Sequence, residues 1–254
     1  MPRVWRNPKV YTFRPEKEKQ KFEISTATIW ILLMLLLLTG LVYFFLFSNY
    51  FKIKNVYIVG ADVFENEISD IIQQNIAQKS NIFLFPDKLI EQRISQDYSV
   101  FSQVTITKGI PNAIKVDLIK REPILIYSHQ DKNFLVDQGG IAFESKNIPN
   151  NLPKVDKDQE INLGDKAFTQ DFVSFVKKLW DIFPVKTHLK IVKIQVPETD
   201  FVLEVFVEPG WKAIFDTTKD CQRQVDSLAL LLPEISGQKI EYIDLRLEEK
   251  MYYK

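Results

Sequence analysis

A run of 21 apolar residues, ATIWILLMLLLLTGLVYFFLF, occupies residues 27–47, and no charged residue occurs between Ile24 and Phe51. As a helix such a run is about 31 Å long, which matches the roughly 30 Å hydrocarbon core of a bilayer. Leu, Ile, Phe or Val fills 14 of its positions, and together these side chains favour insertion by about 4 to 8 kcal/mol. The sequence therefore predicts a transmembrane helix within residues 24–50.

The flanks of this run predict its orientation. Residues 1–23 hold seven Lys or Arg against three Asp or Glu, whereas only Lys52 and Lys54 follow the run closely. By the positive-inside rule, residues 1–23 form a cytoplasmic tail and residues 52–254 lie outside the cytoplasm. A cleaved signal peptide is the alternative, but the run is longer than the usual apolar region and no A-x-A-like site follows it. We expect a single-pass type II protein of the cell membrane, in contact with the lipid bilayer.

The charge of the remaining chain argues against a nucleic-acid partner. The protein has 33 basic and 33 acidic residues, so 26 basic and 30 acidic residues fall within 52–254. Binding to phosphates requires a concentrated basic surface, and this region is slightly acidic without a basic cluster. We therefore expect no nucleic acid among the partners.

The residue types that carry catalysis are scarce. His129 and His188 have no metal-ligand spacing, so we expect both to be solvated loop residues. The single cysteine, Cys221, cannot form an intramolecular disulfide, and with only Arg223 as a basic neighbour it reads as an inert thiol. We expect no catalytic residue, metal, cofactor or small-molecule substrate.

Residues 51–121 predict one compact unit. A short strand ends at Gly60, and isoleucines at helical spacing follow in residues 65–78. Pro86 suits the first turn of a second helix, whose inner face we expect to hold Leu89, Ile90 and Ile94. VTITK and IKVDLIK then alternate with a period of two around a turn at residues 109–112. The order β-α-α-β-β is that of a POTRA domain, a module that binds polypeptides.

Residues 122–254 predict a second, mixed region. FLVDQGGIAF, residues 134–143, reads as a hairpin in which Asp and Gly supply the turn. Apolar residues at helical spacing predict a helix in residues 168–183, after which His188 opens a strand-like stretch. Two further strands meet at Pro209 and Gly210, and a helix follows in residues 221–232. For Asp137, stabilisation of its own turn is a sufficient role.

Several motifs give the chain a family resemblance. F-x-I-x-x-V-x-I-x-G runs from Phe51 to Gly60, PN-x-I-x-V-x-L from Pro111 to Leu118, and REPI from Arg121 to Ile124. V-D-x-x-G-x-x-F follows from Val136 to Phe143, then LPKV at residues 152–155 and YIDLR at residues 242–246. Directly after a single span, this combination resembles the FtsQ/DivIB family of bacterial cell-division proteins.

The resemblance covers about 200 of the 254 residues. It implies an α+β fold in which residues 51–121 form a POTRA domain and residues 122–254 form the family's β-domain, with a mostly antiparallel sheet. The chain departs from the family at Leu125, where a small residue is common, and at residues 248–250, where glycine often stands. Without glycine a two-residue turn is disfavoured, so we expect a final loop of about three to five residues.

The closing residues predict an exposed strand edge. Ile243, Leu245 and Leu247 alternate with polar residues, so one face of this strand can join the core. Met251–Tyr253 would pair back as a short last strand whose outer backbone groups are unbonded. Either the hairpin only completes the sheet, or a partner adds its own strand there. The predicted partner contacts are Ile243, Leu245, Arg246, Leu247, Met251, Tyr252 and Tyr253.

The family resemblance favours the second interpretation, because FtsQ/DivIB proteins bind the small division proteins FtsB and FtsL, or DivIC, at this edge. It implies a non-enzymatic scaffold at the division septum that helps to control septal peptidoglycan synthesis, and whose POTRA domain meets other division proteins. The alternative is a POTRA-containing adaptor, or a protein-assembly or secretion factor, unrelated to division. An outer-membrane barrel is excluded, because about sixteen spanning strands do not fit into the residues after Arg121.

Overall fold

The computed structural model describes residues 25–254 except 131, 146–147, 150, 209 and 248–251. The chain divides into two compact units, Met1–Ser48 and Asn49–Lys254. Each unit is described by itself.

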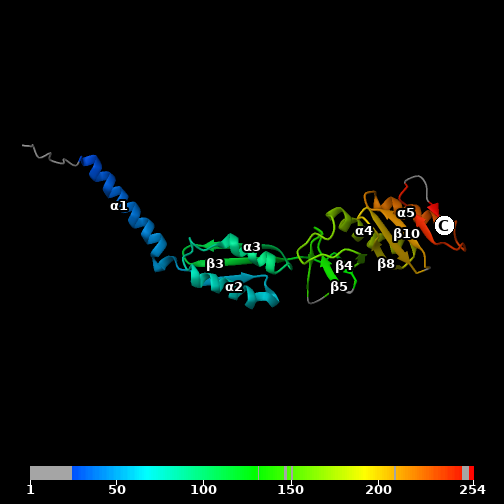
Figure 1. Ribbon diagram of the computed structural model, residues 1–254, viewed down its shortest axis with the longest axis horizontal. Helices are drawn as coiled ribbons and strands as arrows, with labels where there is room; N and C mark the ends of the chain where they lie inside the picture. The colour runs from blue at the N-terminus through cyan, green and yellow to red at the C-terminus, as the bar shows by residue number, and fades with distance from the viewer. Residues whose placement is uncertain (1–24, 131, 146–147, 150, 209, 248–251) are drawn as a thin grey trace, which may run out of the picture. The chain divides into compact units, whose positions relative to one another are not determined.

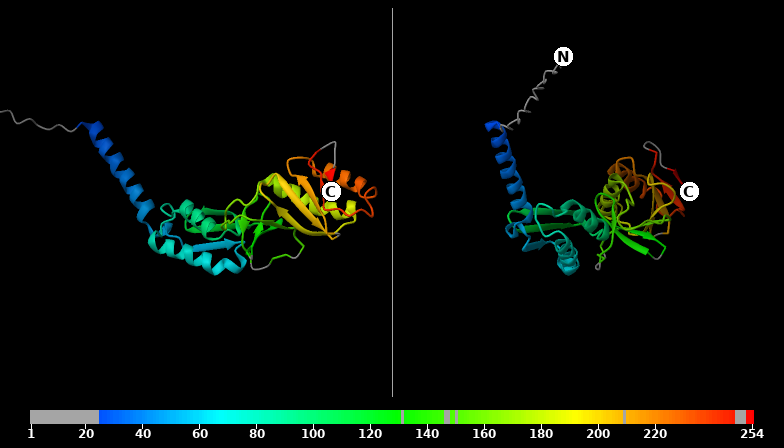
Figure 2. Two further views of the ribbon diagram at one scale, coloured as in Figure 1. Left: turned by 45° about the vertical axis from the view of Figure 1, so that its right-hand side comes forward. Right: turned by 60° about the vertical axis from the view of Figure 1, so that its left-hand side comes forward.

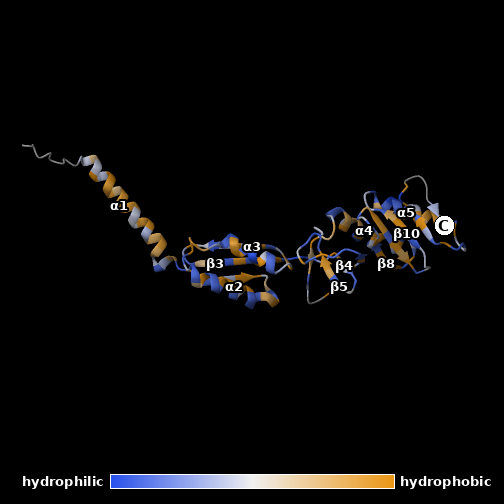
Figure 3. Ribbon diagram, in the orientation of Figure 1, coloured by the Kyte–Doolittle hydropathy of each residue, from blue (hydrophilic) through white to orange (hydrophobic). Residues whose placement is uncertain are grey.

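The first unit contains the helix α1 (Thr26–Phe47), which Figure 3 shows orange and pale along its length. Ser25 caps its start, since the backbone N–H of Ala27 donates to Ser25 Oγ at 3.3 Å. No residue of the helix is buried. An 18-residue window within it has a mean hydropathy of 2.7. The predicted span thus corresponds to a helix that is long and apolar enough to cross a bilayer.

The second unit begins with the predicted β-α-α-β-β order, visible in Figure 1. We call these elements the three-stranded unit. The short 3₁₀ turns η1 (Asn49–Phe51) and η2 (Asp62–Phe64) flank its first strand. Its strands form a sheet in the order β1-β3-β2, in which β1 is parallel and β2 antiparallel to β3. The elements are β1 (Asn55–Val59), α2 (Glu65–Gln78), α3 (Asp87–Asp97), β2 (Phe101–Gly109) and β3 (Ala113–Lys120).

The core of the three-stranded unit lies between its helices and one face of its sheet. Ile114, Val116 and Leu118 of β3 are buried, with Ile72 of α2 and Ile94 of α3 in the same cluster. This alternation along β3 is the period-two pattern expected from the sequence.

Leu89 and Gly60 refine the expectation for this unit. The inward placement of Leu89 is wrong, because the side chain is exposed. Ile90 and Ile94, four residues apart, form the buried stripe, and Leu89 is turned by about 100° from Ile90. Gly60 has φ 84°, and a Cβ there would lie 2.1 Å from the Leu118 carbonyl oxygen, so the end of β1 requires glycine.

The other strands form a nine-stranded sheet in the order β12-β11-β10-β9-β8-β7-β4-β5-β6. Among the described strands, five of the eight neighbouring pairs are antiparallel, so the predicted α+β class and the mostly antiparallel sheet are confirmed. The strands are β4 (Leu125–His129), β5 (Lys132–Val136), β6 (Ala142–Phe143), β7 (Lys154–Lys157), β8 (Ile191–Val196), β9 (Val202–Val207), β10 (Lys212–Asp216), β11 (Tyr242–Asp244) and β12 (Tyr252–Tyr253).

Helices α4 (Gln170–Thr187) and α5 (Cys221–Leu231) cover one face of this sheet, as Figure 2 shows. Along β9, Leu203, Val205 and Val207 are buried against them, while the residues between are partly exposed. α5 also forms the crossover between β10 and β11, which pair in parallel. The opposite face of the sheet has no helix of the described residues packed on it.

The ends of α4 differ from the prediction. Thr169 is the N-cap, since the N–H of Phe172 donates to its Oγ1 at 3.2 Å. The helix continues past Pro184 to Thr187, because a proline in the last turn removes few helical hydrogen bonds. His188 is therefore the C-cap, with φ 57°, and does not open the next strand. That strand, β8, begins at Ile191.

Two of the family motifs meet in space. A side-chain nitrogen of Arg121, in REPI, forms an ion pair with Asp137, in the V-D-x-x-G turn, and the two side chains are only 18% and 13% exposed. Arg121 Nε also donates to the Ser99 carbonyl oxygen at 2.9 Å, and Asp137 Oδ1 accepts the N–H of Ile141 at 2.9 Å. Asp137 therefore stabilises its own turn, as predicted, and also binds the residue that follows β3.

Apolar side chains reinforce this connection. Leu135 of β5 and Phe143 of β6 are buried in the core cluster of the three-stranded unit, not in that of the nine-stranded sheet. The first strands of the larger sheet thus pack against the smaller unit.

Candidate functional site

The predicted partner site lies at the edge of the nine-stranded sheet formed by β12. β11 lies between β10, to which it is parallel, and β12, to which it is antiparallel. β12 has a sheet neighbour on one side only. The edge expected from the sequence is therefore present in the described residues.

The register determines which backbone groups of β12 face outward. The N–H of Lys254 donates to the Tyr242 carbonyl oxygen at 3.2 Å, and the N–H of Tyr242 donates to the Lys254 carbonyl oxygen at 3.4 Å. In an antiparallel pair such bonded positions alternate with non-bonded ones, so Tyr252 opposite Asp244 is also a bonded pair. Tyr253, opposite Ile243, is then a non-bonded pair. Its N–H and C=O point away from β11, to the open side of the sheet.

Two predicted contacts are corrected by burial. Ile243 is 0% and Leu245 3% exposed, and both belong to the apolar core. Their side chains cannot touch a partner while the sheet is folded. They hold β11 in place instead, since the N–H of Leu245 still donates to the Ile214 carbonyl oxygen at 2.9 Å.

The strand prediction for residues 242–247 is too long. β11 ends at Asp244, and Leu247 is 51% exposed, outside the core face on which its alternation placed it. The chain turns because Arg246 folds back onto Asp244 and because Lys219 Nζ donates to the Arg246 carbonyl oxygen at 2.6 Å. The predicted final loop falls on residues 248–250, which, like Met251, lie outside the described residues.

The side chain of Arg246 is already engaged within the protein. Its Nε donates to Asp244 Oδ1 at 2.9 Å and its Nη2 donates to Asp244 Oδ2 at 2.7 Å. The two residues therefore form a bidentate ion pair. The Arg246 hydrogen bonds lower the pKa of the Asp244 carboxyl below its ordinary value and raise the pKa of Arg246. A partner that uses Arg246 must therefore share it with Asp244 or replace Asp244.

A hollow of about 620 Å³ lies beside this turn. Exposed Phe201 and Leu247 line it together with the ion pair of Asp244 and Arg246. Phe201 was not among the predicted site residues. It lies directly before β9, which begins at Val202.

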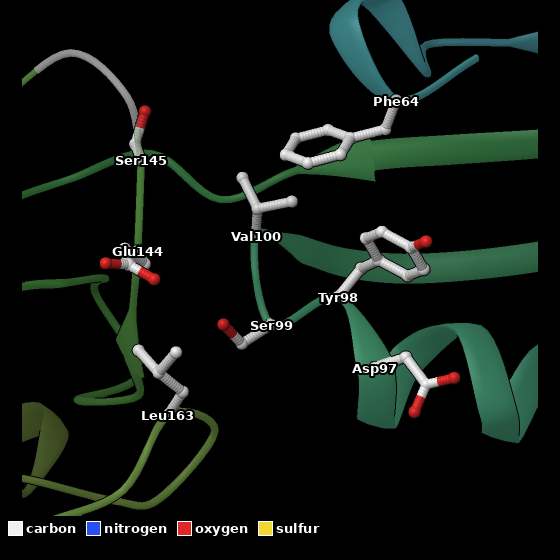
Figure 4. Close-up of a pocket in the computed structure, with 8 residues that line it drawn as sticks. All are labelled: Phe64, Asp97, Tyr98, Ser99, Val100, Glu144, Ser145 and Leu163. Carbon is white, nitrogen blue, oxygen red and sulfur yellow. The ribbon is translucent and has the colours of Figure 1, made fainter. Parts of the chain in front are cut away.

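Another pocket, of about 290 Å³, lies between the α3–β2 connection and the residues that follow β6, as Figure 4 shows. Residues 97–100 lie on one side of it and Glu144, Ser145 and Leu163 on the other. Among its described lining residues the polar side chains are carboxylates and hydroxyls, with no histidine, lysine or cysteine to serve as base or nucleophile.

The histidines and the cysteine lie apart from both pockets. His129 Nδ1 is 3.3 Å from the Lys157 carbonyl oxygen and the residue is partly buried, whereas His188 is exposed. Burial raises the pKa of the Cys221 thiol to about 12, which makes it unreactive. Within the described ranges, no three His, Cys, Asp or Glu side chains gather as a metal site would require.

Comparisons with known proteins bear on the family. The chain is similar to the cell division protein FtsQ of Chloroflexus aurantiacus, with 24% identity over 217 residues, which cover 83% of this chain and 76% of the relative. No family model matches the chain.

A solved structure also shares some of the chain. It is the major extracytoplasmic domain of the trans isomer of the cell division protein DivIB from Geobacillus stearothermophilus, with 14% identity over 46% of this chain and 92% of that one. Its TM-score of 0.27 is too low to bear on the fold.

The chain also carries the motifs at Phe51–Gly60, Arg121–Ile124 and Tyr242–Arg246, and its helix α1 is long and apolar enough to cross a membrane. Together, the similarity to FtsQ and these motifs support the FtsQ/DivIB family of bacterial cell-division proteins as the family of this chain.

Proposed function

We propose that this protein is a non-enzymatic scaffold of the division machinery that binds FtsB/FtsL-type, or DivIC-type, bitopic proteins at the β12 edge. Through them it helps to control septal peptidoglycan synthesis. The observation that carries the proposal is the open side of β12, where the N–H and C=O of Tyr253 have no strand beside them in the described sheet. A partner strand placed there would continue the ladder with main-chain hydrogen bonds.

The side chains around this edge can select the partner. Tyr252 and Tyr253 are half exposed and, as successive strand residues, present one ring to each face of the sheet. Tyrosines of this kind give large contact area at low entropic cost and are common at binding hot spots. On the helix-free side the hollow between Phe201 and Leu247 can receive an apolar partner side chain.

A proline variant and an alanine variant of Tyr253 test the edge. Tyr253→Pro removes the outward donor and should weaken binding of the FtsB-like protein of the same organism about tenfold or more. Tyr253→Ala, which keeps the N–H but lacks the ring, is the matched control and should lose less. Affinity is measured with the full chain in nanodiscs. Equal binding by Tyr253→Pro and the unmodified chain would reject strand addition at this edge.

Two further variants separate the edge from the hollow. Leu247→Asp places a charge beside the hollow and should weaken the same complex without unfolding the protein, because Leu247 is exposed. Removal of residues 250–254 deletes β12 itself and should abolish binding. Unchanged affinity after that deletion would move the contact elsewhere on the molecule.

The proposal includes the arrangement of the chain. Residues 1–23 form the cytoplasmic tail, residues 51–121 the POTRA domain and residues 122–254 the β-domain, both outside the cytoplasm. Protease added to intact spheroplasts should degrade residues 52–254 and leave the tail, and a fluorescent fusion should gather at the septum. A uniform distribution around the cell would favour the adaptor unrelated to division.

A further inference from the structure

Two loops flank the segment by which the chain enters the three-stranded unit. The N–H of Ile82, in the α2–α3 loop, donates to the Phe51 carbonyl oxygen at 3.0 Å, and the N–H of Ile53 donates to the Ser80 carbonyl oxygen at 2.8 Å. On the other side, the N–H of Lys54 donates to the carbonyl oxygen of Asn112, in the β2–β3 turn, at 2.9 Å. The entry segment and both loops therefore form one end of the unit.

Large apolar side chains are exposed at this end. Tyr50 is 59% exposed, Phe83 41%, Leu84 51% and Ile110 67%. The α2–α3 loop is not free to fold them inward, because its Asn81 accepts the N–H of Phe83 at 2.9 Å and the N–H of Leu84 at 3.1 Å. A soluble surface rarely gathers four such residues on three neighbouring segments.

Basic side chains surround the same end. Lys52, Lys54 and Lys79 are exposed, and none of them takes part in an ion pair among the described residues. The acidic residue at the start of α3, Asp87, is engaged by Lys108 at 3.1 Å. The charged rim is therefore positive.

The short chain between α1 and the three-stranded unit indicates what covers this apolar end. α1 ends at Phe47, and four residues span at most about 14 Å, so Phe51 cannot lie farther than this from the end of the helix. Because of this short connection, the loops bonded to Phe51 and Lys54 can reach the bilayer that α1 would enter. Exposed aromatic and aliphatic side chains surrounded by lysines are typical of protein surfaces that bind the headgroup layer of a membrane.

We propose that Tyr50, Phe83, Leu84 and Ile110, with Lys52, Lys54 and Lys79, form a membrane-docking surface. The apolar tips enter the interfacial layer of the outer leaflet, and the lysines bind anionic headgroups. The surface adds a second point of attachment beside α1, which restrains the direction in which the three-stranded unit leaves the membrane. The inference depends on α1 as an anchor and is independent of any division partner.

Lipid-depth measurements on the full chain test the proposal. The unmodified protein serves as the labelling blank, because buried Cys221 does not react. Leu84→Cys and Ile110→Cys carry an environment-sensitive fluorophore, and Leu230→Cys, at an exposed leucine of α5, is the matched control. In phosphatidylcholine–phosphatidylglycerol proteoliposomes, brominated lipids should quench the labels at 84 and 110 about twofold or more beyond the label at 230.

The outcomes distinguish the possible occupants. Equal quenching at 84, 110 and 230 overturns the proposal. A blue-shifted label that brominated lipid does not quench, and whose shift grows with the protein-to-lipid ratio, identifies a second copy of the chain and also overturns it. Combined Lys52→Glu, Lys54→Glu and Lys79→Glu should reduce quenching in vesicles with phosphatidylglycerol. If that charge reversal has no effect, the lysines have no part in docking.

Discussion

The two ends of the nine-stranded sheet are formed by strands of the same length and opposite character. β6 (Ala142–Phe143) and β12 (Tyr252–Tyr253) are both two residues long. Both residues of β6 are buried, and its backbone is engaged by a neighbouring loop, with Ala142 N–H donating to the Asp165 carbonyl oxygen at 2.9 Å. Both residues of β12 are half exposed. One edge is covered by the protein itself, and the other has no described strand beside it.

This difference shows that a short edge strand has no single meaning. A short strand protects a sheet against unwanted pairing when the chain also covers it. At β6 the cover is complete, since Gly164 N–H donates to the Ala142 carbonyl oxygen at 2.8 Å and Phe143 joins the core of the three-stranded unit. At β12, among the described residues, brevity and nearby charges protect the edge. Substitutions at the covered edge should therefore act on stability, and those at the open edge on binding.

The largest effect is expected at Gly140, beside the covered edge. This residue has φ 83°, and a Cβ would lie 2.0 Å from the Phe168 carbonyl oxygen, so Gly140→Ala must displace backbone. We expect a loss of about 3 kcal/mol or more in the free energy of unfolding, measured by urea denaturation of the detergent-solubilised chain.

Gly237→Ala is the matched control, because Gly237 has φ 84° with no atom within 4 Å of the added Cβ. It should lose only the backbone penalty of about 1 kcal/mol. Similar losses for the two variants would show that the Phe168 contact is not restrictive.

The second effect concerns the ion pair that ties the covered edge to the smaller unit. Asp137→Ala removes both the Arg121 partner and the acceptor of the Ile141 N–H, and should cost about 2 to 3 kcal/mol. Asp137→Asn retains the acceptor and should cost less. The measurement is the midpoint of chemical unfolding for each variant. If both variants unfold like the unmodified protein, the pair does not hold the two sheets together.

A third, smaller effect compares two prolines on the open edge. Tyr252→Pro removes a donor that faces β11 and should cost about 1 kcal/mol, whereas Tyr253→Pro removes one that faces outward and should cost less than about 0.5 kcal/mol. Thermal unfolding monitored by circular dichroism gives both values. The reverse order would mean that the register of β12 is shifted by one residue.

The smallest effect is the pH response of Asp244. Its pKa is lowered chiefly by hydrogen bonds from Arg246, so this pair contributes stability above pH about 4 that is lost as the pH falls through the lowered pKa. Arg246→Gln should return the pKa of Asp244 toward its ordinary value and remove that loss. Carboxyl carbon NMR measures the titration. An unchanged Asp244 pKa in the variant would assign the shift to another neighbour.

Local patterns predicted most elements of the fold. The apolar run gave α1, isoleucine spacing gave α2 at residues 65–78, and the V-D-x-x-G motif gave the β5–β6 hairpin. These features depend on neighbours within a few residues, where periodicity and turn chemistry act. Leu89 was misplaced because helical spacing alone allows more than one apolar stripe on a short helix.

The candidate site was less predictable because its determinants are distant in sequence. Alternation placed Leu247 on the core face, but Arg246 pairs with Asp244 and Lys219 holds the Arg246 carbonyl oxygen, so the strand ends early. The pairing of Arg121 with Asp137 likewise joins two motifs that sequence spacing alone cannot connect. Only the register of β12 on β11 shows that Tyr253, and not Tyr252, offers its backbone to the open side.

The crossover through α5 has a consequence for the order of assembly. Because β11 joins β10 in parallel, the intervening chain with α5 must traverse the sheet before the final ribbon can find its place. If a partner strand adds to β12 as proposed above, it therefore extends a ribbon whose place in the sheet depends on that crossover.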